Sequence, residues 1–180
     1  MVTTKRTTAE DLLRLEDDWP RFELIEGELV ELTPPSPEHA SIVATVTIVI
    51  GSQILRNSLG QVYAGDAAVL LHEDPDIVLG PDVAMVAADR LPLKQSSFMT
   101  IPPDWAIEVA SPGNTHREIE RKIRLYLAHG VKSVWIIYPR ERQVVIHTQR
   151  NDPQRFTATE TIAGIEPFPG ISVQVSEIFD

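Results

Sequence analysis

The chain has 180 residues, of which 43% are hydrophobic, and a formal net charge of −10. This length and composition suit one compact core, so we expect a single domain over residues 1–180. The absence of cysteine excludes disulfide bonds and thiolate metal sites. Because no apolar run reaches the roughly 18–20 residues of a membrane helix, and residues 1–8 lack an apolar signal core, we expect a cytoplasmic protein with no membrane segment.

The charge is distributed unevenly along the chain. Residues 111–150 hold eight Lys/Arg and three Asp/Glu, whereas residues 1–110 hold seven and 18. A strongly acidic chain is unusual for a nucleic-acid-binding protein, which normally shows a basic surface. The basic segment is therefore either a phosphate-contacting surface or a solvated helix followed by an arginine-rich hairpin, and charge alone does not decide between them.

The first elements in chain order carry capping and turn signals. Thr7 or Thr8 can cap a short helix over residues 9–15, because an acidic residue follows three positions later. Strands are expected at 22–25 and 28–31, around a turn at Glu26-Gly27. Ser36-Pro37 is typical of a helix start and predicts a helix over residues 38–55.

The rest of the chain alternates strand-like stretches with one amphipathic helix. The expected strands are residues 61–71, 82–87, 105–110, 133–138, 143–148, 156–161 and 171–175. The helix spans residues 115–129, where apolar residues recur at helical spacing, and Gly130 can terminate it. This order predicts an α/β fold, or an α+β mixed sheet, with helices packed against the sheet.

Two carboxylates, Asp82 and Glu108, stand among apolar neighbours in strands expected to be buried. A buried carboxylate is costly unless it is paired, hydrogen-bonded or bound to a metal. Taken singly, each is more often a strand-end cap or an outward-facing side chain. Taken together, on strands expected to be adjacent and followed by a basic helix, they indicate a shared cation. Their oxygen ligands suit Mg²⁺ or Mn²⁺.

Lys122 lies at the margin of the apolar stripe of the helix over residues 115–129. On a helical wheel it lies about 40° from Glu118, whereas the apolar residues span about 80° to 180°. Its ammonium group can therefore reach along the sheet toward Glu108. The alternative is an ordinary surface salt bridge with Glu118, worth a few tenths of a kcal/mol.

Several motifs, taken in this order, resemble the Uma2 family of restriction-endonuclease-like proteins. They are residues 80–86 (GPDVAMV), residues 103–112 (PDWAIEVASP), the series Glu118, Lys122 and Tyr126, and residues 130–139 (GVKSVWIIYP). Residues 22–29 (FELIEGEL) and the helix with His39 also match that pattern. The resemblance covers residues 9–139.

The resemblance implies a restriction-endonuclease-like PD-(D/E)xK core with flanking helices, in which Asp82 and Glu108 are metal ligands. Glu23 matches an acidic position near the same site, and we expect it to be a catalytic residue that binds the metal through water or holds a second metal. The lysine expected two residues after the glutamate is replaced by Ala110, and the resemblance makes Lys122 its substitute. The Val109 carbonyl is expected to complete the set for Mg²⁺ or Mn²⁺. His39 can also face the site, but we favour its interpretation as a helix-packing residue.

These observations predict a metal-dependent endonuclease that hydrolyses DNA phosphodiester bonds, with residues 111–150 contacting phosphate oxygens. The alternative is a non-catalytic nuclease-fold module for binding or assembly, which the replaced lysine and the acidic composition favour. Hydrolysis of another phosphoester is a third reading. A homodimer would match the two-fold symmetry of duplex DNA. Residues 162–179 either contact a second subunit or close the core, and we favour the core.

Overall fold

The structure is a computed structural model that describes residues 6–15, 22–93 and 96–180. Its elements, in chain order, are α1 (Ala9–Leu13), β1 (Phe22–Ile25), β2 (Glu28–Glu31), α2 (Pro37–Val46), the π-helical turn η1 (Thr47–Gly51), α3 (Ser52–Arg56), β3 (Gly60–Ala64), β4 (Val69–His72), β5 (Ile77–Leu79), β6 (Val83–Ala87), the 3₁₀ turn η2 (Ala88–Arg90), β7 (Trp105–Val109), α4 (His116–Ala128), β8 (Ser133–Tyr138), β9 (Gln143–Thr148), β10 (Gln154–Thr157), β11 (Thr161–Ala163), β12 (Ser172–Gln174) and the 3₁₀ turn η3 (Val175–Ile178). The expected α+β mixed sheet with helices packed against it is confirmed.

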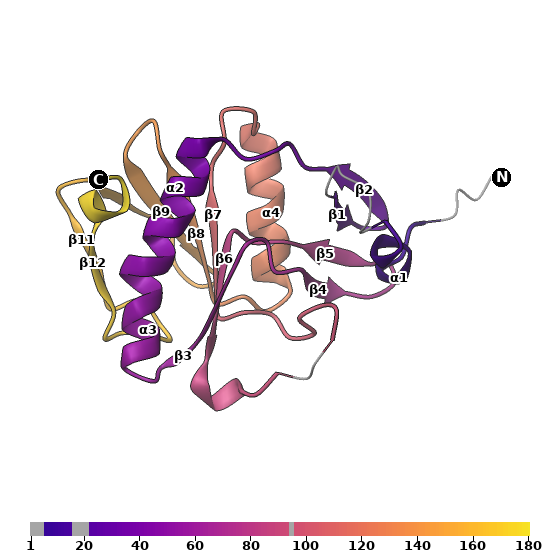
Figure 1. Ribbon diagram of the computed structural model, residues 1–180, viewed down its shortest axis with the longest axis horizontal. Coiled ribbons are helices and arrows are strands. Elements are labelled where there is room, and N and C mark those ends of the chain that lie inside the picture. Colours follow the sequence, from indigo (N-terminus) through magenta and orange to yellow (C-terminus); the bar gives the residue numbers. More distant parts are fainter. Residues whose placement is uncertain (1–5, 16–21, 94–95) are drawn as a thin grey trace.

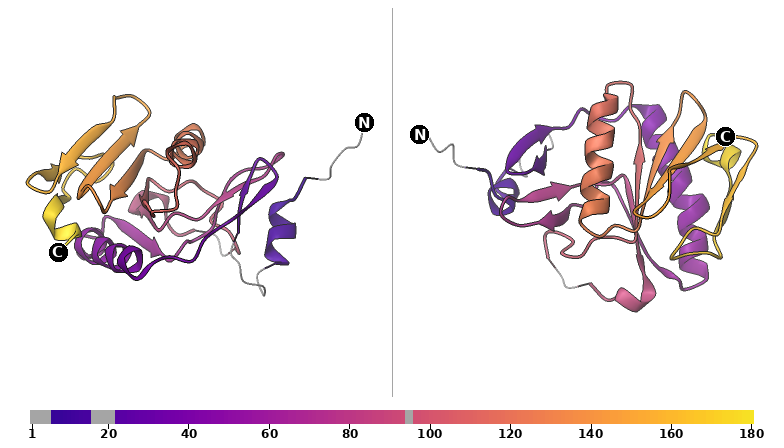
Figure 2. Two further views of the ribbon diagram at one scale, coloured as in Figure 1. Left: turned by 90° about the horizontal axis from the view of Figure 1, so that it is seen from above. Right: turned by 180° about the vertical axis from the view of Figure 1, so that it is seen from behind.

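The central sheet has six strands in the order β10-β9-β8-β7-β6-β3. Strands β7 and β8 pair in parallel, and α4 connects them, while the other neighbours are antiparallel. The α2–α3 helix covers one face and α4 covers the other (Figures 1 and 2). A smaller sheet, in the order β2-β1-β5-β4, stands beside it and carries α1 at the far end (Figure 1).

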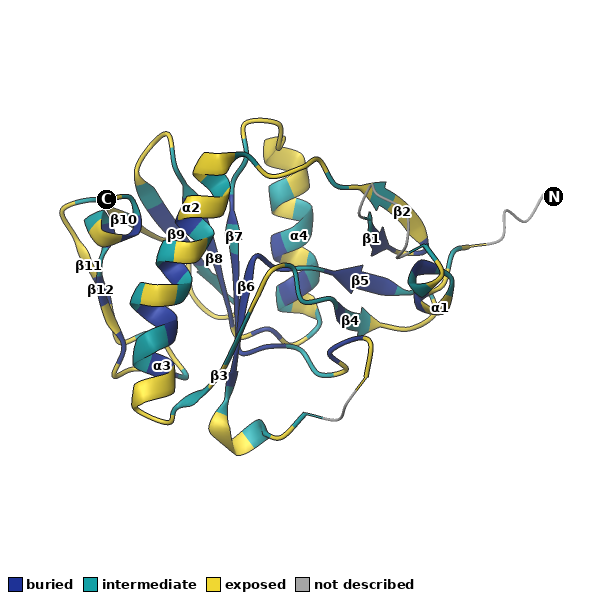
Figure 3. Ribbon diagram, in the orientation of Figure 1, coloured by how far each residue is buried: buried dark blue, intermediate teal, exposed yellow. Residues whose placement is uncertain are grey.

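Alternation along β7 sends its side chains to the two faces of the central sheet. Trp105, Ile107 and Val109 join the main core beneath α2, whereas Ala106 joins the core beneath α4. Glu108 follows the same alternation and is therefore directed toward α4. Burial concentrates on these central strands and on the helix faces that cover them (Figure 3).

The predicted helix over residues 38–55 is present as a nearly continuous stretch from Pro37 to Arg56. Ser36 caps it by accepting a hydrogen bond from the backbone N–H of His39. Within the described part of the chain, this stretch of 20 residues is long and apolar enough to cross a membrane by length and composition, and 28% of its apolar 18-residue window is buried. Core helices pass the same test, and its inner face, with Val46 and Ile50, belongs to the main core.

Two predicted strands are wrong because each merged two real ones. The stretch 61–71 divides into β3 and β4, which lie in different sheets, because Gly65 and Asp66 adopt positive φ angles of 87° and 58° and turn the chain. The stretch 156–161 likewise divides into β10 and β11. The short strand β5 was not predicted. Three residues carry too little periodic pattern to mark a strand.

The C-terminal stretch closes the core, as predicted. Ile162, Phe168, Ile171, Val173 and Ile178 are buried in the main core beside the α2–α3 helix. Phe168 meets Trp105 edge to face, with ring centroids 4.9 Å apart. The hairpin of β11 and β12 therefore packs into the core of this chain.

Candidate functional site

The crossing from the small sheet to the central sheet places Asp82. Strand β5 ends at Leu79 in one sheet and β6 begins at Val83 in the other, so the intervening residues form the junction. Gly80 makes this junction tight, because an added Cβ would lie 3.2 Å from the backbone oxygen of Asp66. Asp82 therefore lies at the junction between the two sheets, beside the end of β7.

Asp82 is fixed by two donors from different elements. The backbone N–H of Val109 donates to its Oδ2 at 2.6 Å, and His39 Nε2, from the first turn of α2, lies 3.3 Å from the same oxygen. Its other oxygen, Oδ1, accepts no hydrogen bond within the described residues. The side chain is 11% exposed. Asp82 therefore keeps one carboxylate oxygen available at the surface of the site.

Glu108 receives two donors from α4. Lys122 Nζ donates to its Oε2 at 2.8 Å, and the Tyr126 hydroxyl donates to its Oε1 at 2.6 Å. Lys122 and Tyr126 are four residues apart, so they occupy one face of the helix. The parallel pairing of β7 and β8 on either side of the α4 connection holds this face against Glu108.

Glu23 approaches from β1 of the small sheet and shares Lys122 with Glu108. Lys122 Nζ lies 2.9 Å from Glu23 Oε1, which also accepts the backbone N–H of Gly80 at 3.0 Å. The Glu23 side chain is 4% exposed and that of Lys122 is 19% exposed. One ammonium group thus bridges two carboxylates that belong to different sheets.

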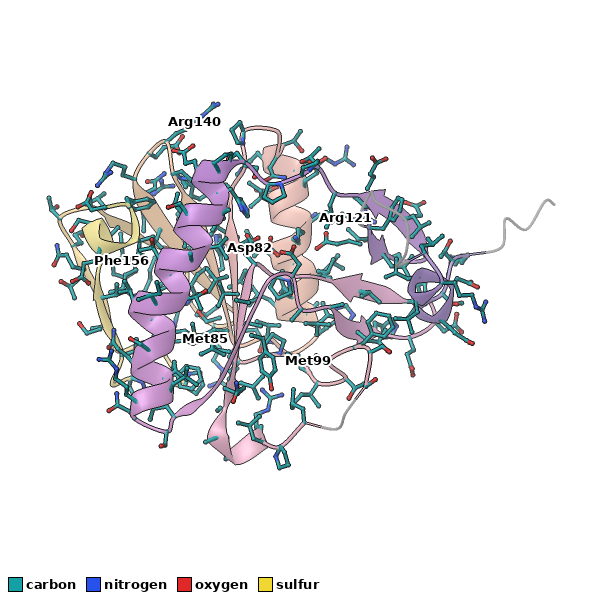
Figure 4. All side chains as sticks on the ribbon, in the orientation of Figure 1. Asp82, Met85, Met99, Arg121, Arg140 and Phe156 are labelled. Atoms are coloured by element: carbon teal, nitrogen blue, oxygen red, sulfur yellow. The ribbon has the colours of Figure 1, made fainter. Side chains whose placement is uncertain are left out.

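These groups line one cavity of about 350 Å³ between α4, the β1–β2 hairpin and the junction at Gly80. Glu23, Asp82, Glu108 and Lys122 all face it, together with His39. Figure 4 places Asp82 between α2 and α4, with Arg121 on the side nearer the hairpin. A ligand in this cavity would meet all three carboxylates.

The cluster contains more negative than positive charge. Three carboxylates face one ammonium group, so when all three are ionised the formal charge is −2 with His39 neutral and −1 with His39 protonated. Burial, reinforced by Asp82 and Glu23, raises the pKa of Glu108 to about 7 against the opposing effect of Lys122. This unbalanced charge in a buried place makes a cation favourable there.

The neighbouring groups respond to the same charges. Burial lowers the pKa of Lys122, but Glu108 and Glu23 outweigh it and the net pKa is raised. Burial and the nearby carboxylates raise the pKa of the Tyr126 hydroxyl. The hydrogen bond from His39 to Asp82 raises the pKa of that imidazole, against the opposing effect of burial. Lys122 is therefore a permanent cation and Tyr126 a permanent donor at ordinary pH.

The donor set fits a hard cation bound through few protein ligands. Within residues 6–15, 22–93 and 96–180, no three His, Asp or Glu side chains are grouped as a ready metal cage. Mg²⁺ does not require one, because it keeps several waters and uses one or two carboxylates. The free oxygen of Asp82, the nearby Glu108 and the unbalanced charge meet that requirement.

Most of the cations in the basic segment 111–150 are paired with carboxylates in the fold. Arg121 pairs with Glu26, Arg124 with Glu120, Lys132 with Asp104 and Arg142 with Asp180. Lys122 is paired with Glu23 and Glu108 in the site. Among the described residues, the cations of this segment that have no carboxylate partner are Arg117, Arg140 and Arg150.

The structure places Glu23, Asp82, Glu108, Lys122 and Val109 around one cavity. Val109 donates its backbone N–H to Asp82, and the roles expected of these residues, including that of the Val109 carbonyl, stay predictions. Lys122 makes no pair with Glu118, whose carboxylate instead accepts the N-cap backbone N–H of Thr115 in a capping box.

Two residues of the site were not assigned to it from the sequence. For His39, packing was favoured over a place in the site, but its ring faces Asp82 and lines the cavity, and its buried Nδ1 has no hydrogen-bond partner among the described residues. Tyr126 was assigned to the apolar stripe. Its spacing of four from Lys122 is the signal that could have identified it.

Comparisons with known proteins concern the family and the fold. The model of the Uma2 family, described as "Putative restriction endonuclease", matches residues 9–176. Among solved structures, the chain is similar to a protein of Anabaena variabilis described as a putative nuclease belonging to DUF820. The TM-score is 0.83 and the identity 22%, over 96% of this chain and 97% of that one. At that identity the likeness shows the fold. No curated protein matches the sequence.

Proposed function

The chain belongs to the Uma2 family of putative restriction endonucleases, and on that premise we propose that it is a metal-dependent endonuclease that hydrolyses DNA phosphodiester bonds. The observation that carries this proposal is the unbalanced negative charge of Glu23, Asp82 and Glu108 beside a single lysine. A buried cluster of this kind is stabilised by a divalent cation. The family match supports nuclease chemistry in general, and the charge balance supports its dependence on metal.

Asp82, Glu108 and the Val109 carbonyl would hold Mg²⁺ or Mn²⁺. The donors are oxygen atoms, which both ions prefer over nitrogen or sulfur. When bound, such an ion supplies charge neutralisation at the phosphate and lowers the pKa of a bound water. His39 and the Val109 N–H would hold the Asp82 carboxylate in place through its Oδ2, and leave Oδ1 for binding.

Lys122 would face the substrate. Its raised pKa keeps it protonated, so it can stabilise negative charge that develops on the phosphate oxygens. Glu23 would position this ammonium group, and Tyr126 would fix the orientation of Glu108. Arg117 and Arg140 are free to contact neighbouring phosphates. The acidic surface elsewhere would limit non-specific affinity for DNA, because counterion release drives such binding.

A second candidate is a non-catalytic module that retains the nuclease fold for binding or assembly. The contact that favours it is the bridge from Lys122 to Glu23 and Glu108, because this bridge satisfies the carboxylates in part without any metal. A cytoplasmic location and a homodimer stay predictions under both readings.

The test is cleavage of supercoiled plasmid and of single-stranded DNA in Mg²⁺, Mn²⁺ or EDTA. We expect metal-dependent nicking by the wild type that Asp82→Ala and Glu108→Ala abolish. Glu120→Ala, on the exposed face of α4, is the matched control and should cleave normally. No cleavage by a folded wild type in either metal would refute the proposal and favour the non-catalytic module.

A further inference from the structure

A second cavity of about 240 Å³ adjoins the carboxylate cavity. The two cavities share His39, Ser111 and Asn114, so they lie side by side. The second cavity lies where α2 and α4 begin and where β7 and β8 end, and Figure 4 shows Arg140 on this edge beyond Asp82. A molecule bound at Asp82 and Glu108 therefore has a neighbouring place for the group attached to it.

The walls of this second cavity combine flat apolar surfaces with hydrogen-bond acceptors. The half-buried ring of Tyr138 and the ring of Pro139 line it together with Ile119. Two carboxylates, Glu38 and Glu141, also line it. Neither carboxylate has a cationic partner or a hydrogen bond among the described residues, so both can accept hydrogen bonds from a ligand.

Glu38 and Glu141 share the lining with Arg140 and with the imidazoles of His39 and His116, so the cavity offers hydrogen-bond acceptors as well as donors, which suits a nucleobase. The two carboxylates can accept hydrogen bonds from an exocyclic amino group, as Asp and Glu do with cytosine. An aromatic ring offers a stacking surface for any base. Arg140, which has no partner among the described residues, is the cation that can meet the next phosphate of the strand.

The size of the cavity limits what it can take. Drug-sized ligands occupy pockets of about 300–1,000 Å³, and this one is smaller, so it can hold one base but not a base pair. A base that enters it must be unpaired, either in single-stranded DNA or turned out of a duplex. In one nucleotide the base is linked to its own phosphate. Because the two cavities are neighbours, a base in the second cavity can belong to the nucleotide whose phosphate lies in the carboxylate cavity.

We propose that this second cavity binds one unpaired base of the DNA strand being cut, next to the scissile phosphate, and favours bases with an exocyclic amino group. The proposal rests on the proposed function, because it takes the carboxylate cavity as the place of the scissile phosphate. It makes the protein selective for DNA that is single-stranded at the point of cleavage.

The first test uses free nucleosides, which carry no phosphate and need no metal. The ¹⁵N-labelled full chain is titrated with deoxycytidine and with thymidine in EDTA and followed by NMR. We expect amide shifts at residues 111–114 and 138–141, larger for deoxycytidine than for thymidine. Glu141 is exposed, so the variant Glu141→Gln should fold. It should reduce the preference for deoxycytidine over thymidine at least threefold. Shifts that are absent, or that do not distinguish the two nucleosides, would overturn the proposal.

The second test shows whether the cavity takes a base within a strand. Fluorescence anisotropy in EDTA compares a single-stranded deoxycytidylate pentamer with an abasic pentamer of the same charge. Stacking of one base is worth about 1–3 kcal/mol, or roughly fivefold or more in affinity. We expect Tyr138→Leu to weaken the deoxycytidylate pentamer at least fivefold and to leave the abasic pentamer unchanged, while Tyr138→Phe keeps wild-type affinity.

Equal weakening of both pentamers, or of neither, would overturn the proposal. If Tyr138→Leu does not fold, Glu141→Gln provides the same comparison, with deoxycytidylate and thymidylate pentamers as the pair. Both tests measure binding without metal or cleavage. Failure of metal-dependent cleavage with both binding effects present would therefore refute the proposed activity alone, and cleavage without the binding effects would refute the base cavity alone.

Discussion

Replacing Lys122 with methionine tests whether the carboxylate cluster is desolvated and short of positive charge. Lys122 is 19% exposed and lies within 2.9 Å of Glu23 and 2.8 Å of Glu108, whose side chains are 4% and 15% exposed. Removing one partner of a buried ion pair leaves an uncompensated charge and costs about 3–5 kcal/mol. We expect Lys122→Met to lower the free energy of unfolding by about that amount at pH 8 in EDTA, measured by urea denaturation.

Two comparisons make this measurement decisive. Arg124→Met lies on the same helix, but its pair with Glu120 is 3.9 Å long and exposed, so it should change the unfolding free energy by no more than about 0.5 kcal/mol. Adding Mg²⁺ should recover more stability in Lys122→Met than in the wild type. A loss below about 1 kcal/mol in Lys122→Met, with no response to Mg²⁺, would mean that the carboxylates are solvated and would refute the reasoning.

The remaining predictions concern the groups around this lysine. The pKa of Glu108 is raised from 4.5 to about 7, so between these pH values the folded protein holds a proton that the unfolded chain releases, and stability falls as pH rises. Glu108→Gln should therefore gain stability relative to the wild type from about pH 4.5 to pH 7 in urea titrations in EDTA, and a constant difference would contradict this. His39→Ala should lower the rate of DNA cleavage roughly 10–100-fold, because Asp82 loses a positioning partner, and His39→Gln should lower it less. Tyr126→Phe leaves Glu108 Oε1 without its donor and should cost about 1–3 kcal/mol in unfolding free energy at pH 8, and no loss would show that water replaces the hydroxyl.

Elements with local signals could be predicted from the sequence. The hairpin of β1 and β2, the Thr8 cap and the Ser36 cap depend on residues within a few positions of one another, and all three are present. The turn at Gly65 was missed because a single glycine in an apolar stretch is also compatible with a continuous strand. Whether Gly65 forms a turn depends on β3 and β4 joining different sheets, which is a long-range feature of the fold.

The site divides in the same way. Asp82 and Glu108 were recognisable because a carboxylate in an apolar strand needs a partner. For His39 the sequence did not favour a place in the site, because its contact with Asp82 crosses 43 positions of sequence and depends on how α2 lies over the sheet. Tyr126 illustrates the other difficulty. An aromatic residue in an apolar stripe packs in the core, and here it also donates a hydrogen bond from that position.

Calorimetric titration of the apoprotein with Mn²⁺ at pH 8 tests most directly whether this cluster is a divalent-cation site. We expect one saturable ion per chain in the wild type and loss of that binding in Asp82→Asn, while Glu120→Gln binds as the wild type does. Absence of saturable binding in the folded wild type, or binding that Asp82→Asn leaves unchanged, would contradict it.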